Sequence, residues 1–125
     1  MKKGLVLLWG MLILIIVACD AEDGSAVEQL SGDELEEKMS DDDTLLVIDV
    51  REEREFAEER VPGMENMPLS TFEDTYHELP EEEIYVFCRS GNRSMEAADI
   101  LKGAGYENVY NVKGGITDWE GPTEK

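Results

Sequence analysis

The sequence contains little cysteine and histidine. Its 125 residues include one histidine, His77, and two cysteines, Cys19 and Cys88. A structural metal site needs several such side chains at short spacing, and this pattern is missing, so we expect no metal centre. A paired Cys-His nucleophile also has no evident candidate, because His77 falls at a predicted helix end far along the chain from Cys88. We interpret His77 as a surface residue.

Positive charge is also scarce. Eleven Lys and Arg face 30 Asp and Glu, which gives a formal net charge of −19. Such a chain repels phosphate backbones and anionic lipid surfaces, so nucleic acid is excluded as a partner. The acidic runs Asp41–Asp43 and Glu81–Glu83 are typical of solvated loops. Internal repeats and low-complexity segments are absent.

The sequence has one long apolar run, from Leu5 to Val17, preceded by Lys2 and Lys3. The run is shorter than the roughly 18 residues that a membrane span needs, which favours a signal peptide over an uncleaved anchor helix. Ile16-Val17-Ala18-Cys19 resembles the box of a bacterial lipoprotein signal. We therefore predict a signal peptide over residues 1–18, a lipidated Cys19 with a tether over residues 19–25, and an extracytoplasmic domain anchored to the cell membrane.

The remaining chain predicts an α/β fold. Apolar runs indicate strands, and amphipathic stretches between them indicate helices. The expected strands are Ala26 to Leu30, Leu45 to Val50, Met64 to Met67, Ile84 to Phe87 and Asn108 to Val112; the expected helices are Ser31 to Met39, Glu52 to Glu59, Thr71 to His77 and Ser94 to Lys102. Continuous apolar strands are typical of a mostly parallel sheet with helices on both faces. The length suits a single domain over residues 26–122 with a short tail, 123–125.

Cys88 is the main candidate for chemistry. It ends the apolar run that starts at Ile84 and opens a polar loop that contains Arg89, Ser90, Gly91, Asn92, Arg93 and Ser94. Neighbouring cations and a helix N-terminus lower a thiol pKa from about 8.5 to roughly 3.5–7.5. Ligands of parallel sheets bind beyond the carboxyl ends of the strands, where Cys88 falls. We therefore predict an exposed thiolate nucleophile in an anion cradle of loop amides, although a buried Cys that ends a core strand is the alternative.

The loop from Cys88 to Ser94 resembles the active-site loop of rhodanese-type sulfurtransferases. Three further stretches match in the family's order: Val47 to Arg51 with Glu55-Phe56, Val61 to Leu69, and Val112 to Trp119. Arg60 departs from the family, which often has His before the Ile-Pro-Gly motif; we interpret this position as structural. The resemblance implies a rhodanese-like fold over most of the chain after the tether.

The resemblance also implies a double displacement without metal or organic cofactor. Cys88 would take sulfur from a small anionic donor such as thiosulfate, become a persulfide, and pass the sulfur to a thiol acceptor. Arg89 and Arg93 would bind the donor, Gly91 would let the loop close, and amides from Ser90 to Arg93 would stabilise the outer sulfur. The hydroxyls of Ser90 and Ser94 would add donors. We expect a monomer.

Two other functions stay open. A non-catalytic, membrane-tethered rhodanese-like module would keep the fold without chemistry. The resemblance to related arsenate reductases and phosphatases would require a loop of the pattern Cys-x-x-x-x-x-Arg. The loop from Cys88 to Arg93 is one residue shorter, which disfavours both activities. Asp49 and Arg51, at a strand end, are expected to be structural, and Trp119 either packs over the core or lines the site.

Overall fold

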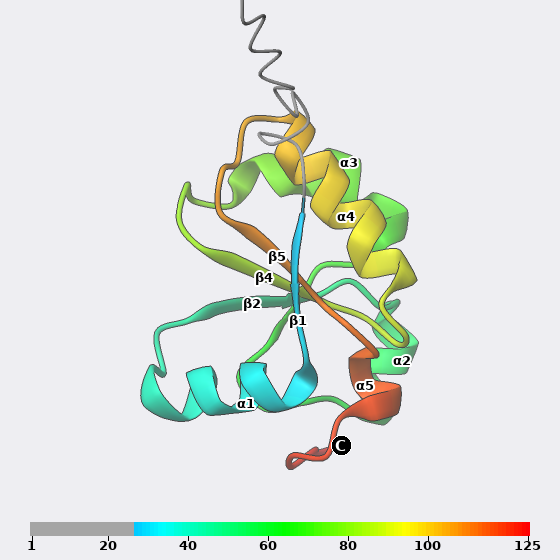
Figure 1. Ribbon diagram of the computed structural model, residues 1–125. Helices are drawn as coiled ribbons and strands as arrows, with labels where there is room; N and C mark the ends of the chain where they lie inside the picture. The colour runs from blue at the N-terminus through cyan, green and yellow to red at the C-terminus, as the bar shows by residue number, and fades with distance from the viewer. Residues whose placement is uncertain (1–26) are drawn as a thin grey trace, which may run out of the picture.

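The computed structural model describes residues 27–125 (Figure 1). Five parallel strands form one sheet in the order β1-β5-β4-β2-β3. Their bounds are Glu28–Leu30 for β1, Leu46–Asp49 for β2, Glu65–Asn66 for β3, Ile84–Phe87 for β4 and Val109–Val112 for β5. β4 lies in the centre of the sheet and is buried along its whole length, as its unbroken apolar sequence predicts.

Helices connect the strands in the α/β alternation that the sequence predicts. Their bounds are Gly32–Asp41 for α1, Glu53–Glu58 for α2, Phe72–Thr75 for α3, Asn92–Gly103 for α4 and Gly115–Asp118 for α5, with 3₁₀ turns at Leu69–Thr71 (η2) and Tyr76–Glu78 (η3). Ser31 and Glu34 form a capping box at the start of α1. Within residues 27–125, no helix is both long and apolar enough to cross a membrane.

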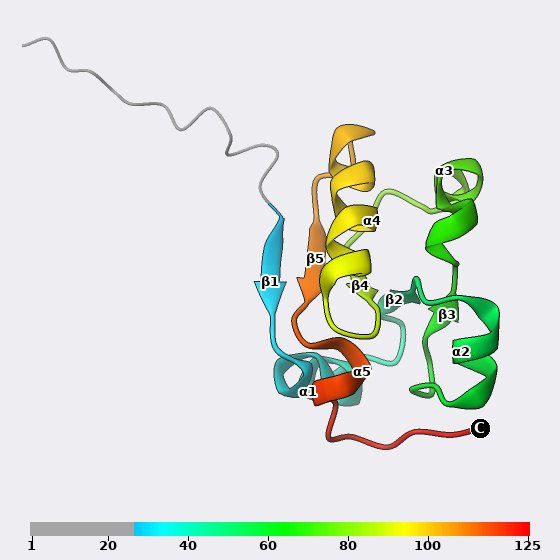
Figure 2. The ribbon, with the colours of Figure 1, turned by 90° about the vertical axis from the view of Figure 1, so that its right-hand side faces the viewer.

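The sheet is covered on both faces, so the predicted fold class is confirmed. Figures 1 and 2 show α3 and α4 on one face and α1 with α5 on the other. The first face packs a cluster that includes Val86, Cys88, Ala98 and Leu101. The second packs a cluster that includes Leu35 and Phe87, with Trp119 against it. Alternation along β4 therefore sends Cys88 toward α4 and its neighbour Phe87 toward α1.

Several predicted bounds differ from the structure. α4 begins at Asn92, two residues before the predicted start, because Gly91 adopts a left-handed conformation and ends the loop there. The predicted helix Thr71 to His77 is α3 between two 3₁₀ turns, and α5 has no predicted counterpart. The predicted signal peptide, Cys19 and the tether lie outside the described residues.

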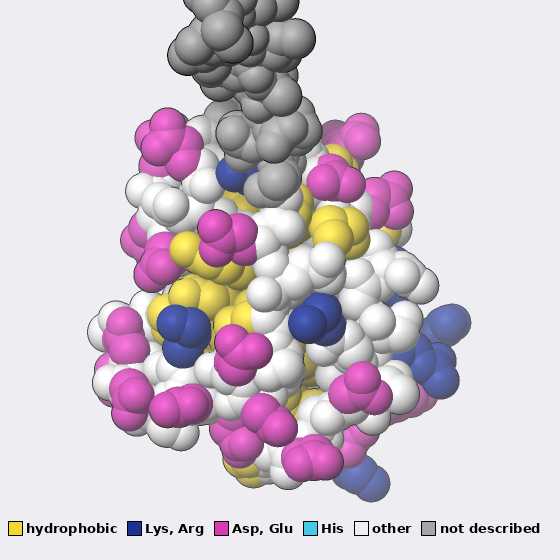
Figure 3. All heavy atoms as spheres, in the orientation of Figure 1, with side chains coloured by type: hydrophobic (Ala, Val, Ile, Leu, Met, Phe, Trp, Pro, Cys, Tyr) yellow, Lys and Arg dark blue, Asp and Glu magenta, His cyan; other side chains and the backbone are white. Residues whose placement is uncertain are grey.

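Acidic side chains dominate the visible surface. Figure 3 shows Asp and Glu spread over the face seen in Figure 1, with fewer Lys and Arg among them. This distribution agrees with the excess of acidic residues in the sequence. An anionic ligand is therefore repelled by the protein as a whole, and only groups within about 8 Å, the screening length at physiological salt, can favour it locally.

Candidate active site

Cys88 follows β4 directly, at the carboxyl ends of the central strands. Its neighbour Phe87 pairs with Asp49 of β2, and the Val50 amide donates to the Phe87 carbonyl. Cys88 is only 1% exposed, so the prediction of an exposed thiol is wrong. The side chain points into the cluster under α4 because residues 84, 86 and 88 share one face of the strand. The sulfur therefore lies on the buried side of the loop, next to the core cluster under α4.

The Gly91 amide and the Ser94 hydroxyl contact the Cys88 sulfur. The Gly91 amide donates to Sγ over 3.0 Å, and the Ser94 Oγ lies 3.3 Å from Sγ. Gly91 has a φ of +102°, which turns its amide inward and which a side chain would strain. Ser94 sits in the first turn of α4 and is fully buried. Among the predicted loop residues, Ser94 is thus the one whose side chain contacts the sulfur, while Gly91 contacts it through its backbone.

The thiol environment combines burial with several hydrogen bonds. Burial raises the pKa of the Cys88 thiol, while the Ser94 side chain, in the orientation in which its hydroxyl donates to sulfur, and the amides of Ser94, Gly91 and Ser90 lower it. The pKa is lowered overall. Hydrogen bonds to the charged form stabilise a thiolate even where solvent is excluded. The loop can therefore hold a negative charge on sulfur, as the sequence predicts.

The segment from Gly115 to Thr117 packs against the outside of the Cys88 loop. The Ile116 amide donates to the Cys88 carbonyl over 2.9 Å, and the Thr117 amide donates to the Arg89 carbonyl over 3.0 Å. Gly115 has a φ of +49°, and a Cβ there would overlap the Cys88 carbonyl oxygen. This segment therefore turns the loop carbonyls outward and leaves the inner side to amides. The adjacent glycines Gly114 and Gly115 are the sequence signal for this close backbone approach.

Arg93 is engaged by a carboxylate rather than free. Its two terminal nitrogens donate to Glu55 over 2.7 and 2.9 Å. The hydrogen bond from Arg93 lowers the Glu55 pKa to about 2, and burial opposes the shift. The reciprocal hydrogen bond raises the pKa of Arg93. Glu55 thus joins α2 to the first turn of α4, and it neutralises part of the charge that the sequence assigns to anion binding.

The other predicted loop residues face solvent. Arg89, Ser90 and Asn92 are exposed. Arg89 lines a cavity of about 320 Å³ whose other lining residues are Arg51, Glu55, Glu58, Glu59, Ile116 and Thr117. Within residues 27–125, no ion pair involves Arg89. The guanidinium of Arg89 is therefore available to a ligand in this cavity, although three glutamates line the same cavity.

Asp49 and Arg51 form a buried ion pair. The Arg51 guanidinium donates to the Asp49 carboxylate over 2.8 to 3.1 Å and to the Glu59 carbonyl over 2.8 Å. Asp49 is fully buried, and Arg51 is 4% exposed. These contacts connect the end of β2 to the end of α2, in agreement with the predicted structural role.

Asn111 on β5 is a site residue that sequence reasoning missed. It is 2% exposed, and its side chain contacts the Ser94 hydroxyl, the Gly91 carbonyl and Gln29. β5 is otherwise buried mainly through apolar side chains. A buried amide within an apolar strand was the available signal, because buried polar groups require partners.

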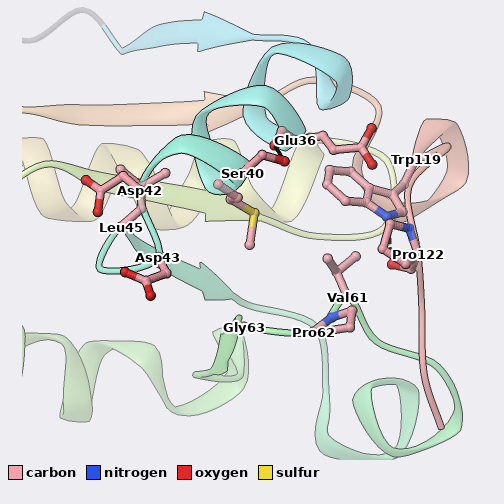
Figure 4. Close-up of a pocket in the computed structure, with 11 residues that line it drawn as sticks. Glu36, Ser40, Asp42, Asp43, Leu45, Val61, Pro62, Gly63, Trp119 and Pro122 are labelled. Carbon is pink, nitrogen blue, oxygen red and sulfur yellow. Dashed lines mark hydrogen bonds between the residues drawn. The ribbon is translucent and has the colours of Figure 1, made fainter.

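Trp119 packs away from the Cys88 loop. Its ring meets Phe87 edge-on at 6.0 Å, and its Nε1 donates to the Pro122 carbonyl over 3.1 Å. It lines a cavity of about 340 Å³ together with Met39, Val61 and other residues, but not Cys88 (Figure 4). Trp119 therefore covers the core on the α1 side. His77 is exposed, and residues 27–125 contain no group of His, Cys, Asp and Glu suited to a metal.

Comparison with known proteins identifies the family of this chain. Curated relatives include a Bacillus subtilis protein, YrkF, provisionally named a sulfur carrier, and a sulfurtransferase of Allochromatium vinosum. YrkF is 38% identical over 105 residues, which are 83% of this chain and 57% of YrkF. The Allochromatium protein is 30% identical over 94 residues, which are 74% of this chain and 88% of that protein. The chain thus spans little more than half the length of YrkF.

Solved structures share the fold. SSP1007 of Staphylococcus saprophyticus has a TM-score of 0.72 and 30% identity, over 79% of this chain and 100% of that one. A rhodanese-like domain protein of Staphylococcus aureus has a TM-score of 0.70 and 28% identity, over 74% and 91%. The rhodanese-like domain family matches residues 31–122. The chain therefore belongs to the rhodanese-like domain family, with sulfurtransferases and sulfur carriers among its relatives.

Proposed function

We propose that the chain moves sulfane sulfur from thiosulfate or a similar donor to a thiophilic acceptor through a persulfide on Cys88. One observation carries this proposal: the Cys88 sulfur lies 3.0 Å from the Gly91 amide, inside a loop whose hydrogen bonds lower its pKa. A thiol that is stabilised as thiolate needs no general base to act as nucleophile. The names of the relatives place sulfur transfer and sulfur carriage in the same family.

In the first step, the Cys88 thiolate attacks the outer sulfur of thiosulfate. A new S–S bond forms to Cys88 while the S–S bond of thiosulfate breaks, and sulfite leaves with the electron pair. The product is a Cys88 persulfide whose outer sulfur carries the negative charge. No external oxidant or reductant is consumed, because the outer sulfur arrives at the oxidation level that it keeps.

In the second step, an acceptor attacks the outer sulfur. Cyanide would leave as thiocyanate, and a thiolate would leave as a persulfide; in both cases the bond to Cys88 breaks and the Cys88 thiolate returns. The loop amides act as preorganised dipoles toward sulfur in each step. These amides already point at the sulfur before the reaction, so they stabilise the negative charge on the thiolate and on the persulfide without reorganisation.

Donor binding would depend chiefly on Arg89. Arg93 is held by Glu55, so its charge is partly compensated. Arg89 is exposed beside the loop and lines the adjoining cavity. A charge-assisted hydrogen bond from Arg89 to a sulfonate oxygen would place the donor over the loop.

Intact mass spectrometry tests the proposal. The full chain, purified in detergent and reduced, is incubated with thiosulfate and compared with a Cys88→Ser variant. A gain of one sulfur atom in the unsubstituted chain alone, removed by cyanide, is the expected result. Lack of a gain with thiosulfate and with organic persulfide donors, in folded protein with a free thiol, would overturn catalysis and favour the non-catalytic module. If a Cys19→Ser variant gains the same sulfur atom as the unsubstituted chain, the sulfur is bound to Cys88.

A further inference from the structure

Three side chains form a buried row beneath the loop: Cys88, Ser94 and Asn111. Their exposed fractions are 1%, 0% and 2%. Ser94 is the middle member, because its Oγ lies 3.3 Å from the Cys88 Sγ and makes a short hydrogen bond with the Asn111 Oδ1. The members come from the loop after β4, from α4 and from β5, so the fold itself brings them together. Water has little access to any of the three.

The backbone determines which way the Asn111 amide faces. Its Nδ2 lies 3.3 Å from the Gly91 carbonyl oxygen and 3.2 Å from the Gln29 Oε1. A carbonyl oxygen only accepts hydrogen bonds, so the atom of Asn111 that faces Gly91 must be the NH₂ group. The opposite atom, Oδ1, then faces Ser94 and can only accept.

The Ser94 hydroxyl has one proton and two neighbours that could receive it. Asn111 Oδ1 always accepts, whereas the Cys88 sulfur donates as a thiol and accepts as a thiolate. With the proton on the Asn111 side, Ser94 presents a lone pair to sulfur and accepts from the S–H. This arrangement satisfies all three groups in the thiol state. Once the thiolate forms, the same lone pair faces a negative charge.

We propose that Asn111 is a positioning residue that holds the Ser94 proton away from Cys88, so that loop amides alone stabilise the thiolate. This inference rests on the proposed function only in treating Cys88 as the nucleophile. Ser94 can lower the pKa of Cys88 only when its proton points at sulfur, and Asn111 competes for that proton. Asn111 therefore keeps resting Cys88 closer to a neutral thiol than the loop alone would.

Charged groups also lie on the segments that surround the row. They are Arg89 after β4, Arg93 of α4, Glu55 of α2, Asp49 at the end of β2 and Arg51 after β2. Substitutions of Ser94 and Asn111 leave all of these charges in place. A change in the Cys88 pKa in such variants therefore reports the hydrogen bonds of the row.

The proposal predicts opposite roles for Ser94 with and without Asn111. Asn111→Val removes the competing acceptor while keeping a residue suited to a strand. Ser94 can then donate to the thiolate, and we expect the Cys88 pKa to fall by about one unit, the size of one hydrogen bond to a charged group. In this background, adding Ser94→Ala should raise the pKa by about one unit. With Asn111 present, Ser94→Ala should leave the pKa unchanged or lower it.

The pH dependence of iodoacetamide alkylation measures these values. The full chain with Cys19→Ser has Cys88 as its single thiol. Alkylation requires no sulfur donor, so it reports the row even if sulfur transfer fails. Gln29→Ala is the matched control: it removes one partner of Asn111 but keeps the Gly91 anchor, and it should not change the pKa.

Two results would overturn the proposal. One is a folded Asn111→Val variant whose Cys88 pKa is unchanged or raised, since a merely structural Asn111 would not compete for the proton. The other is a rise of about one unit in Ser94→Ala with Asn111 intact, because Ser94 would then already donate to sulfur. The second result decides the question even if circular dichroism shows that Asn111→Val does not fold.

Discussion

Glu55 and Arg93, which are 38 residues apart in sequence, form two hydrogen bonds of 2.7 and 2.9 Å that join α2 to α4. The partners are 19% and 31% exposed at their side chains, so solvent screens the pair only in part. A bidentate pair of this kind fixes a guanidinium in position as well as in charge. The loop from Cys88 to Ser94 is thereby anchored at its carboxyl end, just as the amides of Ile116 and Thr117 anchor its beginning.

The Glu55–Arg93 pair should make stability depend on acid pH. The folded-state pKa of Glu55, about 2, lies below its ordinary value of 4.5, chiefly because Arg93 donates to it. The contribution is therefore complete above about pH 4.5 and is lost as pH falls toward about 2. In urea unfolding, Glu55→Gln should lower the free energy of unfolding by about 1–2 kcal/mol near neutral pH. The difference from the unsubstituted chain should become smaller as the pH falls from about 4.5 to about 2.

The matched control for that experiment is Glu58→Gln. Glu58 is exposed on the same helix and has no ion pair within residues 27–125. We expect its substitution to change stability by less than about 0.5 kcal/mol at any pH. A gap between the unsubstituted chain and Glu55→Gln that stays constant from neutral pH to about pH 2 would contradict the assignment.

Gly115 should tolerate no side chain. A Cβ at this position would overlap the Cys88 carbonyl oxygen and the Arg89 backbone, which cannot move without opening the loop. Gly115→Ala is expected to cost more than about 2 kcal/mol in urea unfolding and to abolish sulfur loading by intact mass.

Gly105→Ala is the control for conformational strain. Gly105 also has a positive φ, +102°, but a Cβ there would meet nothing within 4 Å. Gly105→Ala should lower the free energy of unfolding only by the roughly 1 kcal/mol that a left-handed backbone costs a residue with a Cβ, and it should leave sulfur loading unchanged. Equal losses in the two variants would mean that strain, not contact with the loop, explains Gly115.

The sequence predicted the parts of this site that depend on local pattern. The bounds of β4 and the position of Cys88 follow from an apolar run that ends in a polar loop, and the structure has both. The start of α4 was placed two residues late, since Gly91 caps it through a backbone conformation that the residue type permits but does not dictate.

Contacts between distant segments were beyond such a prediction. Glu55 and Arg93 are both ordinary charged residues, and only the packing of α2 beside α4 pairs them. The burial of Cys88 likewise depends on α4, whose side chains pack with it in one cluster. Asn111 gave a local signal, a polar residue in an apolar strand, but its partner Ser94 could not be named without the fold.

We propose lipidation at Cys19 from the sequence resemblance given above. Full-length protein expressed in a bacterial host with radiolabelled palmitate should carry label and fractionate with membranes, because a thioether-linked diacylglycerol supplies a stable anchor. Cys19→Ser should lose the label. Label that persists in Cys19→Ser, or its absence from the unsubstituted chain in a host that labels its own lipoproteins, would contradict the proposal.

The two ion pairs Asp49–Arg51 and Arg60–Glu124 should differ sharply in what their loss costs. The first is buried, so Asp49→Asn leaves the Arg51 charge without its counterion and should destabilise the fold by about 3 kcal/mol or more. The second spans 3.3 Å between side chains that are 29% and 51% exposed, so Glu124→Gln should cost less than about 1 kcal/mol. Urea unfolding near neutral pH compares the two, and similar losses would show that burial of the Asp49 pair does not govern its contribution.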